Sequence, residues 1–291
     1  LTALGCGQSV EEYFLSGKSK YYSADYQGAI LDFDQVIRRD TLNAEAYQLR
    51  GVSKYILEDH LGAILDLDKS IELNPLAIAS TYRFRGLAKL RSEDYKGALR
   101  DIKDGNNLDP PNASYYPLGV AKYNLEDYRG AIIAFSNSIG QDSTYASQYG
   151  YRGMAKMALK DYTGAANDFN RAIEIDSSTV DNYSLLGVCL QGLEDHLTAI
   201  KVLTRAIEMD PLNSEAYTLR GVSKHQQGHY IEAITDLDKS IELDPSAGIS
   251  YMKRGRARYE LGDHYGACVD FSRAKDLGHL PAEVIFISRC N

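Results

Sequence analysis

A 34-residue periodicity runs through most of the chain and limits the folds that are open to it. Glycine returns at spacings of 33 to 35 residues, eight times in all, at Gly17, Gly51, Gly86, Gly119, Gly153, Gly187, Gly221 and Gly255. A tyrosine stands four residues before each of these glycines, and an alanine stands twelve residues after each. Three invariant columns over eight copies indicate tandem copies of one structural unit.

Each unit carries the hydrophobic pattern of two amphipathic helices. With the glycine numbered as position 8, positions 4, 8 and 11 share one helical face and positions 20, 24 and 27 share another. Position 24 is always large and apolar, as Phe33, Leu67, Ile102, Phe135, Phe169, Leu203, Leu237 and Phe271. A glycine inside a helix costs about 1 kcal/mol, so its return predicts close packing of the two helices. Between them lies a polar break such as Leu57-Glu58-Asp59-His60, where the aspartate is expected to cap the second helix.

These columns resemble the tetratricopeptide repeat family, a 34-residue helix-turn-helix with aromatic, glycine and alanine residues at set offsets. The resemblance implies an all-α fold, a right-handed α-α superhelix (solenoid) of eight repeats. The expected repeats are residues 10–43, 44–78, 79–111, 112–145, 146–179, 180–213, 214–247 and 248–278. We expect a disordered leader at residues 1–9 and a C-terminal capping helix at 279–291, with Gly278 ending the last repeat.

Two columns change together and predict an ion pair inside the repeat. Position 7 is arginine in five repeats, and position 23 of the same repeats is aspartate. The pairs are Arg50 with Asp66, Arg85 with Asp101, Arg152 with Asp168, Arg220 with Asp236, and Arg254 with Asp270. Two other repeats carry Leu118 with Ala134 and Leu186 with Val202. We infer a structural bridge between the two helices of one repeat, which an apolar pair replaces as a unit.

The resemblance also implies a concave groove lined by positions 2, 5, 9, 12 and 13 of the first helices. The candidate groove residues are Val52, Tyr55, Arg83, Leu87, Tyr116, Val120, Tyr123, Met154, Met157 and Val188. Position 5 as a column reads Phe14, Gln48, Arg83, Tyr116, Gly150, Ser184, Thr218 and Met252. Aliphatic and tyrosine side chains along a groove suit an extended peptide or an amphipathic helix. Packing of position 9 between neighbouring repeats is the alternative interpretation, and the sequence leaves it open.

Some members of the family hold the carboxylate terminus of chaperones with lysine and asparagine side chains of the first helices. The corresponding places here hold Leu49 and Phe84 among others, so this clamp is absent from the pattern. Arg83 and Arg91 still predict a basic spot on the third repeat for an acidic residue of a partner.

No catalytic pattern is found, and we expect neither an enzyme nor a cofactor. Phosphate loops, nucleophile elbows and HExxH motifs are missing from the sequence. His225 and His229 have a metal-compatible spacing, but no third ligand lies within reach. His60, His196 and His264 share position 17 with tyrosines, which indicates packing residues. The net charge of −8 with interleaved signs argues against nucleic acid as a partner, and no apolar run predicts a membrane span.

The four cysteines form no CxxC pair and no spacing typical of a disulfide framework. A reducing, cytoplasmic location is therefore the expectation, with Cys189 and Cys268 as small core residues. The segment Ala3-Leu4-Gly5-Cys6 faintly resembles a lipoprotein processing site, so export stays open.

The sequence thus predicts a non-enzymatic scaffold or adaptor that binds a peptide or helical segment of a partner protein in its groove. The alternative is an architectural spacer or dimerisation module of a larger protein, which leaves homo-oligomers open.

Overall fold

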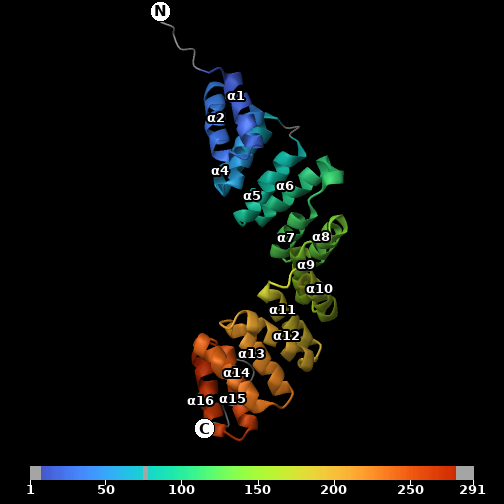
Figure 1. The fold of residues 1–291 in the computed structure, drawn as a ribbon, viewed down its shortest axis with the longest axis vertical. Helices are drawn as coiled ribbons and strands as arrows, with labels where there is room; N and C mark the ends of the chain where they lie inside the picture. Colours follow the sequence, from blue (N-terminus) through green and yellow to red (C-terminus); the bar gives the residue numbers. More distant parts are fainter. Residues whose placement is uncertain (1–7, 75–77, 280–291) are drawn as a thin grey trace, which may run out of the picture. The chain divides into compact units, whose positions relative to one another are not determined.

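The computed structural model describes residues 8–74 and 78–279. These residues contain sixteen α-helices, α1 to α16, in eight consecutive pairs, and one short 3-10 helix, η1. The contacts divide the chain into two compact units, residues 1–141 and 142–291. The predicted all-α fold of stacked helix pairs is confirmed, and each unit is described by itself below (Figure 1).

The first unit contains four helix pairs. Its helices are α1 (Val10–Tyr22), α2 (Tyr26–Arg39), α3 (Ala44–Ile56), α4 (His60–Leu73), α5 (Ala79–Arg91), α6 (Tyr95–Leu108), η1 (Pro110–Asn112), α7 (Tyr115–Asn124) and α8 (Tyr128–Gln141). Ser9 caps α1 and forms a reciprocal capping box with Glu12. Residues 1–7 of the predicted leader lie outside the described residues.

The second unit also contains four pairs. Its helices are α9 (Ala146–Ala158), α10 (Tyr162–Ile175), α11 (Val180–Gly192), α12 (His196–Met209), α13 (Ser214–Gln226), α14 (Tyr230–Leu243), α15 (Gly248–Glu260) and α16 (His264–Asp276). Gly278 follows α16 with a φ of 75°, the conformation of a glycine that ends a helix. The predicted capping helix, apart from His279, lies outside the described residues.

The glycine column permits close packing of the two helices of a repeat. A Cβ atom added to Gly119 would lie 2.6 Å from Cε1 of Phe135, and one added to Gly187 would lie 2.6 Å from Cδ2 of Leu203. All eight alanines of position 20 are fully buried. The side chain of position 24 therefore fills the space that the missing side chain of position 8 leaves, which is the packing reason that the sequence predicted.

The turn inside each repeat is capped as predicted. Asp25, Asp59 and Asp94 each accept a hydrogen bond from the backbone N–H three residues later, and the same bond recurs at four further aspartates. In the seventh repeat His229 takes this place without a side-chain bond. The residue at position 15, directly before the cap, has a positive φ in every repeat. It is Ala24, Glu58, Glu93, Glu126, Lys160, Glu194, Gly228 or Gly262.

The fourth repeat departs from the others at its start. Its first helix, α7, begins at Tyr115, whereas the predicted repeat begins at residue 112. Pro110 and Pro111 form the 3-10 turn η1 instead, because proline lacks an N–H and disfavours helix in the residue before it. The side chain of Asn106 closes this segment by accepting a hydrogen bond of 2.7 Å from the Ser114 backbone N–H.

Candidate functional site

The first helices of the repeats form the inner face of each unit. In the second unit α9 contacts α11, α11 contacts α13, and α13 contacts α15. Consecutive second helices make no such contacts within the described residues. First helices therefore pack more closely than second helices, and the stack is concave on the first-helix side. This is the side on which the predicted groove residues stand.

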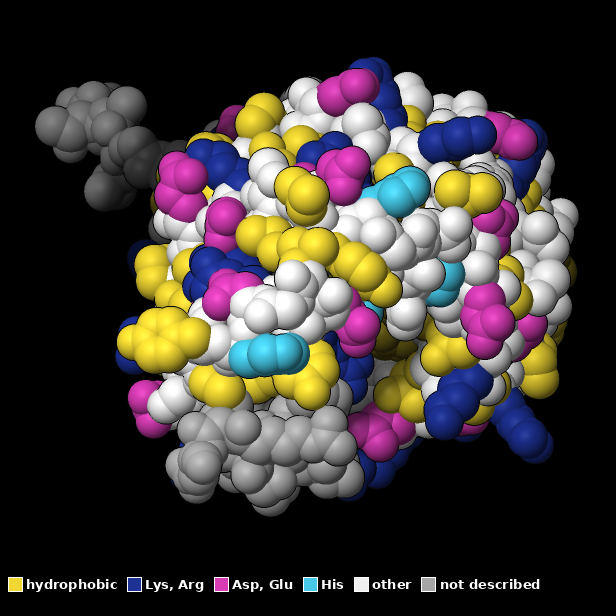
Figure 2. Space-filling view, turned by 90° about the horizontal axis from the view of Figure 1, so that it is seen from below, with side chains coloured by type: hydrophobic (Ala, Val, Ile, Leu, Met, Phe, Trp, Pro, Cys, Tyr) yellow, Lys and Arg dark blue, Asp and Glu magenta, His cyan; other side chains and the backbone are white. Residues whose placement is uncertain are grey.

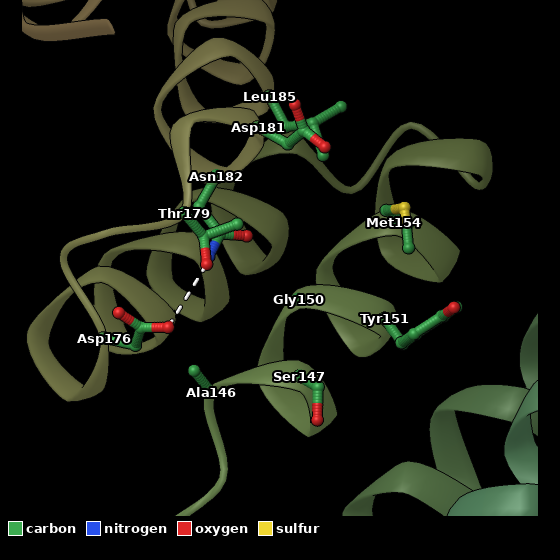
Figure 3. A pocket seen from close by; sticks show the side chains of 10 residues that line it. All are labelled: Ala146, Ser147, Gly150, Tyr151, Met154, Asp176, Thr179, Asp181, Asn182 and Leu185. Carbon is green, nitrogen blue, oxygen red and sulfur yellow. Dashed lines mark hydrogen bonds between the residues drawn. The ribbon is translucent and has the colours of Figure 1, made fainter. Parts of the chain in front are cut away.

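A pocket of about 340 Å³ opens between the first helices of the fifth and sixth repeats (Figure 3). On one side it is lined by α9 through Ser147, Gly150, Tyr151 and Met154. On the other side it is lined by the turn before α11 and by α11 itself, through Asp176, Thr179, Asp181, Asn182 and Leu185. The lining combines apolar groups with carboxylates and an amide, as is usual in binding pockets.

Gly150 opens this pocket because it lacks a side chain. A Cβ atom at this position would lie 3.3 Å from Oδ1 of Asn182. The equivalent pocket between α3 and α5 has Gln48 at position 5, whose side chain donates a hydrogen bond to Ser80, and its volume is about 250 Å³. Glycine occupies position 5 in the fifth repeat, and the other seven repeats carry a side chain there.

The turn that leads into α11 fixes one wall of the pocket. Asp176 accepts hydrogen bonds from the Ser178 backbone N–H (2.9 Å), the Ser178 hydroxyl (2.6 Å) and the Thr179 hydroxyl (3.3 Å). The last of these is drawn in Figure 3. The bond from the Ser178 hydroxyl, followed by its backbone bond, lowers the pKa of Asp176, so this carboxylate is ionised at neutral pH. Asp181 stands in the first turn of α11 and is exposed.

Of the predicted groove residues, Met154 alone lines this pocket. Val52 is buried, and the other nine, Met154 included, are half-buried. Tyr55 lies against His60 and Phe84, with ring centroids 5.7 and 5.8 Å apart. The rings of Tyr123 and Tyr128 are likewise 5.5 Å apart. These tyrosines pack against position 17 of their own repeat, and contact with a partner stays a prediction for them.

Arg83 does not provide the predicted basic spot. Its guanidinium donates hydrogen bonds to the Asp109 carboxylate (3.2 Å), the Asp109 carbonyl (2.7 Å) and the Gly105 carbonyl (3.1 Å). The absence of a side chain at Gly105 makes room for Arg83, since a Cβ there would lie 2.8 Å from its Cγ. The arginine therefore caps the end of α6 instead of facing a partner.

The five arginines of position 7 bond to the aspartates of position 23 in their own repeats. In each pair Nε and Nη2 of the arginine donate to the two carboxylate oxygens. Each arginine also lies over the tyrosine ring three residues before it, as Arg220 does at 5.6 Å from Tyr217. The aspartates are almost fully buried. These groups stabilise the repeat and leave no free charge for a ligand.

Two further partners of this network were not predicted from the sequence. Position 11 supplies a second cation to the same carboxylate, as Lys224 does to Asp236 at 2.7 Å. Position 25 of the preceding repeat accepts from the arginine, as Asp34 does from Arg50 (2.6 Å) and Thr204 from Arg220 (3.1 Å). The arginine thus joins its own repeat to the one before it.

The cysteines differ in part from the expectation. Cys189 is a free, fully buried thiol in the core of the sixth repeat, and burial raises its pKa to about 11. Cys268, predicted as an unpaired core residue, is disulfide-bonded, and its partner lies outside the described residues. Spacing in the sequence gave no sign of this bond because the repeat does not contain a cysteine column.

Three other features bear on the class of protein. None of the helices in the described residues is long and apolar enough to cross a membrane. Within the same residues, no three His, Cys, Asp or Glu side chains gather as metal ligands would. Basic and acidic side chains alternate on the face shown in Figure 2, and the described part of that face has no continuous basic patch.

Comparison with known proteins identifies the repeat. Family profiles of the tetratricopeptide repeat match residues 149–179, 180–211 and 202–235. No curated protein matches the chain in sequence. Residues 149–235 thus match tetratricopeptide repeats, and the sixteen helices of the described residues correspond to about eight repeats of this kind. Repeats of this class form scaffolds for protein interactions, with extended concave binding surfaces.

Solved structures show the same fold. The C-terminal part of a TPR repeat-containing protein from Cytophaga hutchinsonii is 18% identical, with a TM-score of 0.65 over 82% of this chain and 98% of that one. The structure of Cut9-Hcn1 from an APC/C hetero-tetramer is 14% identical, with a TM-score of 0.58. The match covers 99% of this chain and 57% of that one. MamA is 23% identical, with a TM-score of 0.53. The match covers 55% of this chain and 94% of MamA.

Proposed function

We propose that the chain is a non-enzymatic scaffold that holds an extended segment of a partner protein on the first-helix face of its second unit. The pocket between α9 and α11 is the anchor point in this proposal. The observation that carries it is the opening at Gly150, which gives one repeat junction a larger pocket than its equivalent between α3 and α5.

The lining of the pocket supports a peptide as the occupant. Tyr151, Met154 and Leu185 offer apolar surface, and the Asn182 carboxamide offers both a donor and an acceptor. The side chains of an extended segment can pack on the apolar surface, and its unpaired peptide groups can bond to the amide. A single pocket gives modest affinity, so contacts along neighbouring first helices would add to it.

The test is selection of random linear peptides on the intact chain. Wild type is compared with Gly150→Leu, whose side chain fills the pocket, and with Asn182→Ala, which removes the amide without filling the pocket. Gly140→Leu serves as the matched control, because Gly140 lies in α8 with no atom within 4 Å of an added Cβ. Helical circular dichroism and thermal unfolding show whether each variant is folded.

We expect peptides that are retained by wild type and by Gly140→Leu and are lost, by tenfold or more in affinity, with Gly150→Leu. Peptides that bind Gly150→Leu and Asn182→Ala as tightly as wild type would place the site elsewhere and contradict the proposal. A library without any enriched peptide would favour the architectural spacer.

A further inference from the structure

The pocket between α9 and α11 carries charge of one sign. Its lining includes the carboxylates of Asp176 and Asp181 and contains no Lys, Arg or His side chain. Asp181 is exposed and makes no ion pair within the described residues. An acidic group of a partner would meet two carboxylates here, and the partial positive charge at the start of α11 is too small to offset both.

A largely buried residue, Asn182, presents an amide without a protein partner to the same pocket. The exposed fraction of Asn182 is 8%, and its carboxamide has no hydrogen-bonding partner in the part of the chain that the structure describes. Its Oδ1 faces the space above Gly150. The side-chain oxygen and nitrogen of Asn182 are not among the fully buried polar atoms without a partner in the described residues, so they reach the solvent of the pocket, where a ligand can bond to them. A peptide group does so because it has one N–H and one C=O.

Apolar groups line the pocket around the amide. Met154 and Tyr151 of α9 stand opposite Leu185 of α11 in Figure 3, and Asp181 lies beside Leu185. A long aliphatic side chain with a charged end fits this lining, since its methylene groups would cover Met154 and Leu185 while its cation stays in water near the carboxylates. Lysine and arginine are the two residues with such a side chain.

We propose that this pocket selects a lysine or arginine of the extended partner segment. The Asn182 carboxamide binds the peptide group of that residue, Met154 and Leu185 cover its aliphatic stem, and Asp181 with Asp176 attracts its cation. This inference rests on the proposed function and names the side chain that the anchor pocket takes.

Three small probes test the inference on the intact chain. They are the N-acetyl, N-methylamide derivatives of lysine, norleucine and glutamate, which share one peptide backbone and differ at the end of the side chain. Binding is followed by NMR at the Met154 methyl group and at the backbone amides of Gly150 and Asn182. The charge-neutralised variant is Asp176→Asn with Asp181→Asn, in which asparagine retains an oxygen that can accept the turn bonds.

A matched control carries the same two changes one repeat later. Asp210 makes the equivalent turn by accepting a 3.0 Å hydrogen bond from the Leu212 N–H, and Glu215 takes the place of Asp181. Neither lines the pocket. The control variant is therefore Asp210→Asn with Glu215→Gln.

We expect the lysine probe to bind about three- to tenfold more tightly than the norleucine probe, and the glutamate probe more weakly than both. This preference should disappear in the Asp176→Asn, Asp181→Asn variant, persist in the control variant, and shrink at high salt. Equal binding of lysine and norleucine, with shifts still centred on Met154 and Gly150, would overturn the inference and leave the proposed function standing. No shift at these groups with any probe would count against both.

Discussion

Asp236 shows how one buried carboxylate connects three elements. It accepts two hydrogen bonds from Arg220 and forms an ion pair with Lys224. Arg220 also donates a hydrogen bond to Thr204 of the preceding repeat. Asp236 is 3% exposed, so its charge depends on these partners rather than on water.

We predict that Asp236→Ala destabilises the chain by about 3–5 kcal/mol, because it leaves a half-buried arginine without its carboxylate. Adding Arg220→Leu should recover part of this loss, since Leu118 with Ala134 is the natural form of the same exchange in the fourth repeat. Urea unfolding followed by circular dichroism measures both variants.

Glu242→Ala is the control for this experiment. Glu242 pairs with Lys239 on the surface, where ion pairs contribute about 0–1 kcal/mol. A cost for Asp236→Ala as small as that for Glu242→Ala would show that the network is not a stabilising one.

The free thiol gives a prediction on pH. Burial raises the pKa of Cys189 to about 11 from 9.0, so the folded state keeps its proton while the unfolded state loses it between these values. Wild type should therefore lose stability relative to Cys189→Ala as the pH rises from 9 to 11, and the difference should be constant below pH 8. Urea unfolding of the two proteins at several pH values checks this, and a constant difference across the whole range would contradict it.

At the residue scale, the sequence predicted contacts between residues whose columns change together. Arginine and aspartate exchange together for Leu118 and Ala134, so their pairing could be inferred without a structure. The acceptor in the preceding repeat, at position 25, could not be inferred in this way. Its residue type changes from Asp34 to Thr204, although both offer an oxygen to the arginine.

Within the elements, the repeat glycine is tied to the residue that packs against it. We predict that Gly119→Ala destabilises the chain, because its Cβ would lie 2.6 Å from Phe135 and overpacking costs about 1–3 kcal/mol, more than the roughly 1 kcal/mol that alanine gains in a helix. Gly140→Ala, which has open space, should be neutral or stabilising. Thermal unfolding of both variants measures the contrast, and equal effects would contradict the packing account.

In the turn inside each repeat, introducing a glycine is expected to stabilise the chain. Glu58 has a φ of 65°, a conformation that costs a residue with a side chain about 1–2 kcal/mol and costs glycine little. We predict that Glu58→Gly stabilises the chain by about 0.5–1 kcal/mol and that Gly262→Glu at the same position destabilises it by a similar amount. Unfolding midpoints in urea decide the matter, and a loss of stability in Glu58→Gly would refute it.

Helix order and the two interhelical stripes were readable from the sequence because a 3.6-residue period leaves a clear pattern. The late start of α7 was not predicted, since Pro110 and Pro111 override a register that the other repeats share. The pocket was not predicted either. It depends on one glycine in a column of varied residues, Gly150, and on the neighbour that faces it, Asn182, which periodicity does not reveal.

For the molecule as a whole, the central claim is that one repeat junction serves as the anchor of a binding face. The first helices of each unit present an inner surface, yet most of the predicted groove side chains are half-buried between repeats. A binding function therefore depends on where this surface opens, and in the second unit the opening at Gly150, about 340 Å³, is larger than the one of about 140 Å³ between α13 and α15. The chain contains four methionines, of which Met154 lines the pocket, so it offers a direct probe of that claim.

The most direct measurement is a titration of the intact chain, labelled with carbon-13 at the methionine methyl groups, with a peptide selected from the linear library. The account predicts that the Met154 resonance shifts with saturation while Met209 and Met252 stay in place, and that Gly150→Leu abolishes the shift. A peptide that binds and moves Met209 or Met252 without moving Met154 would contradict the account.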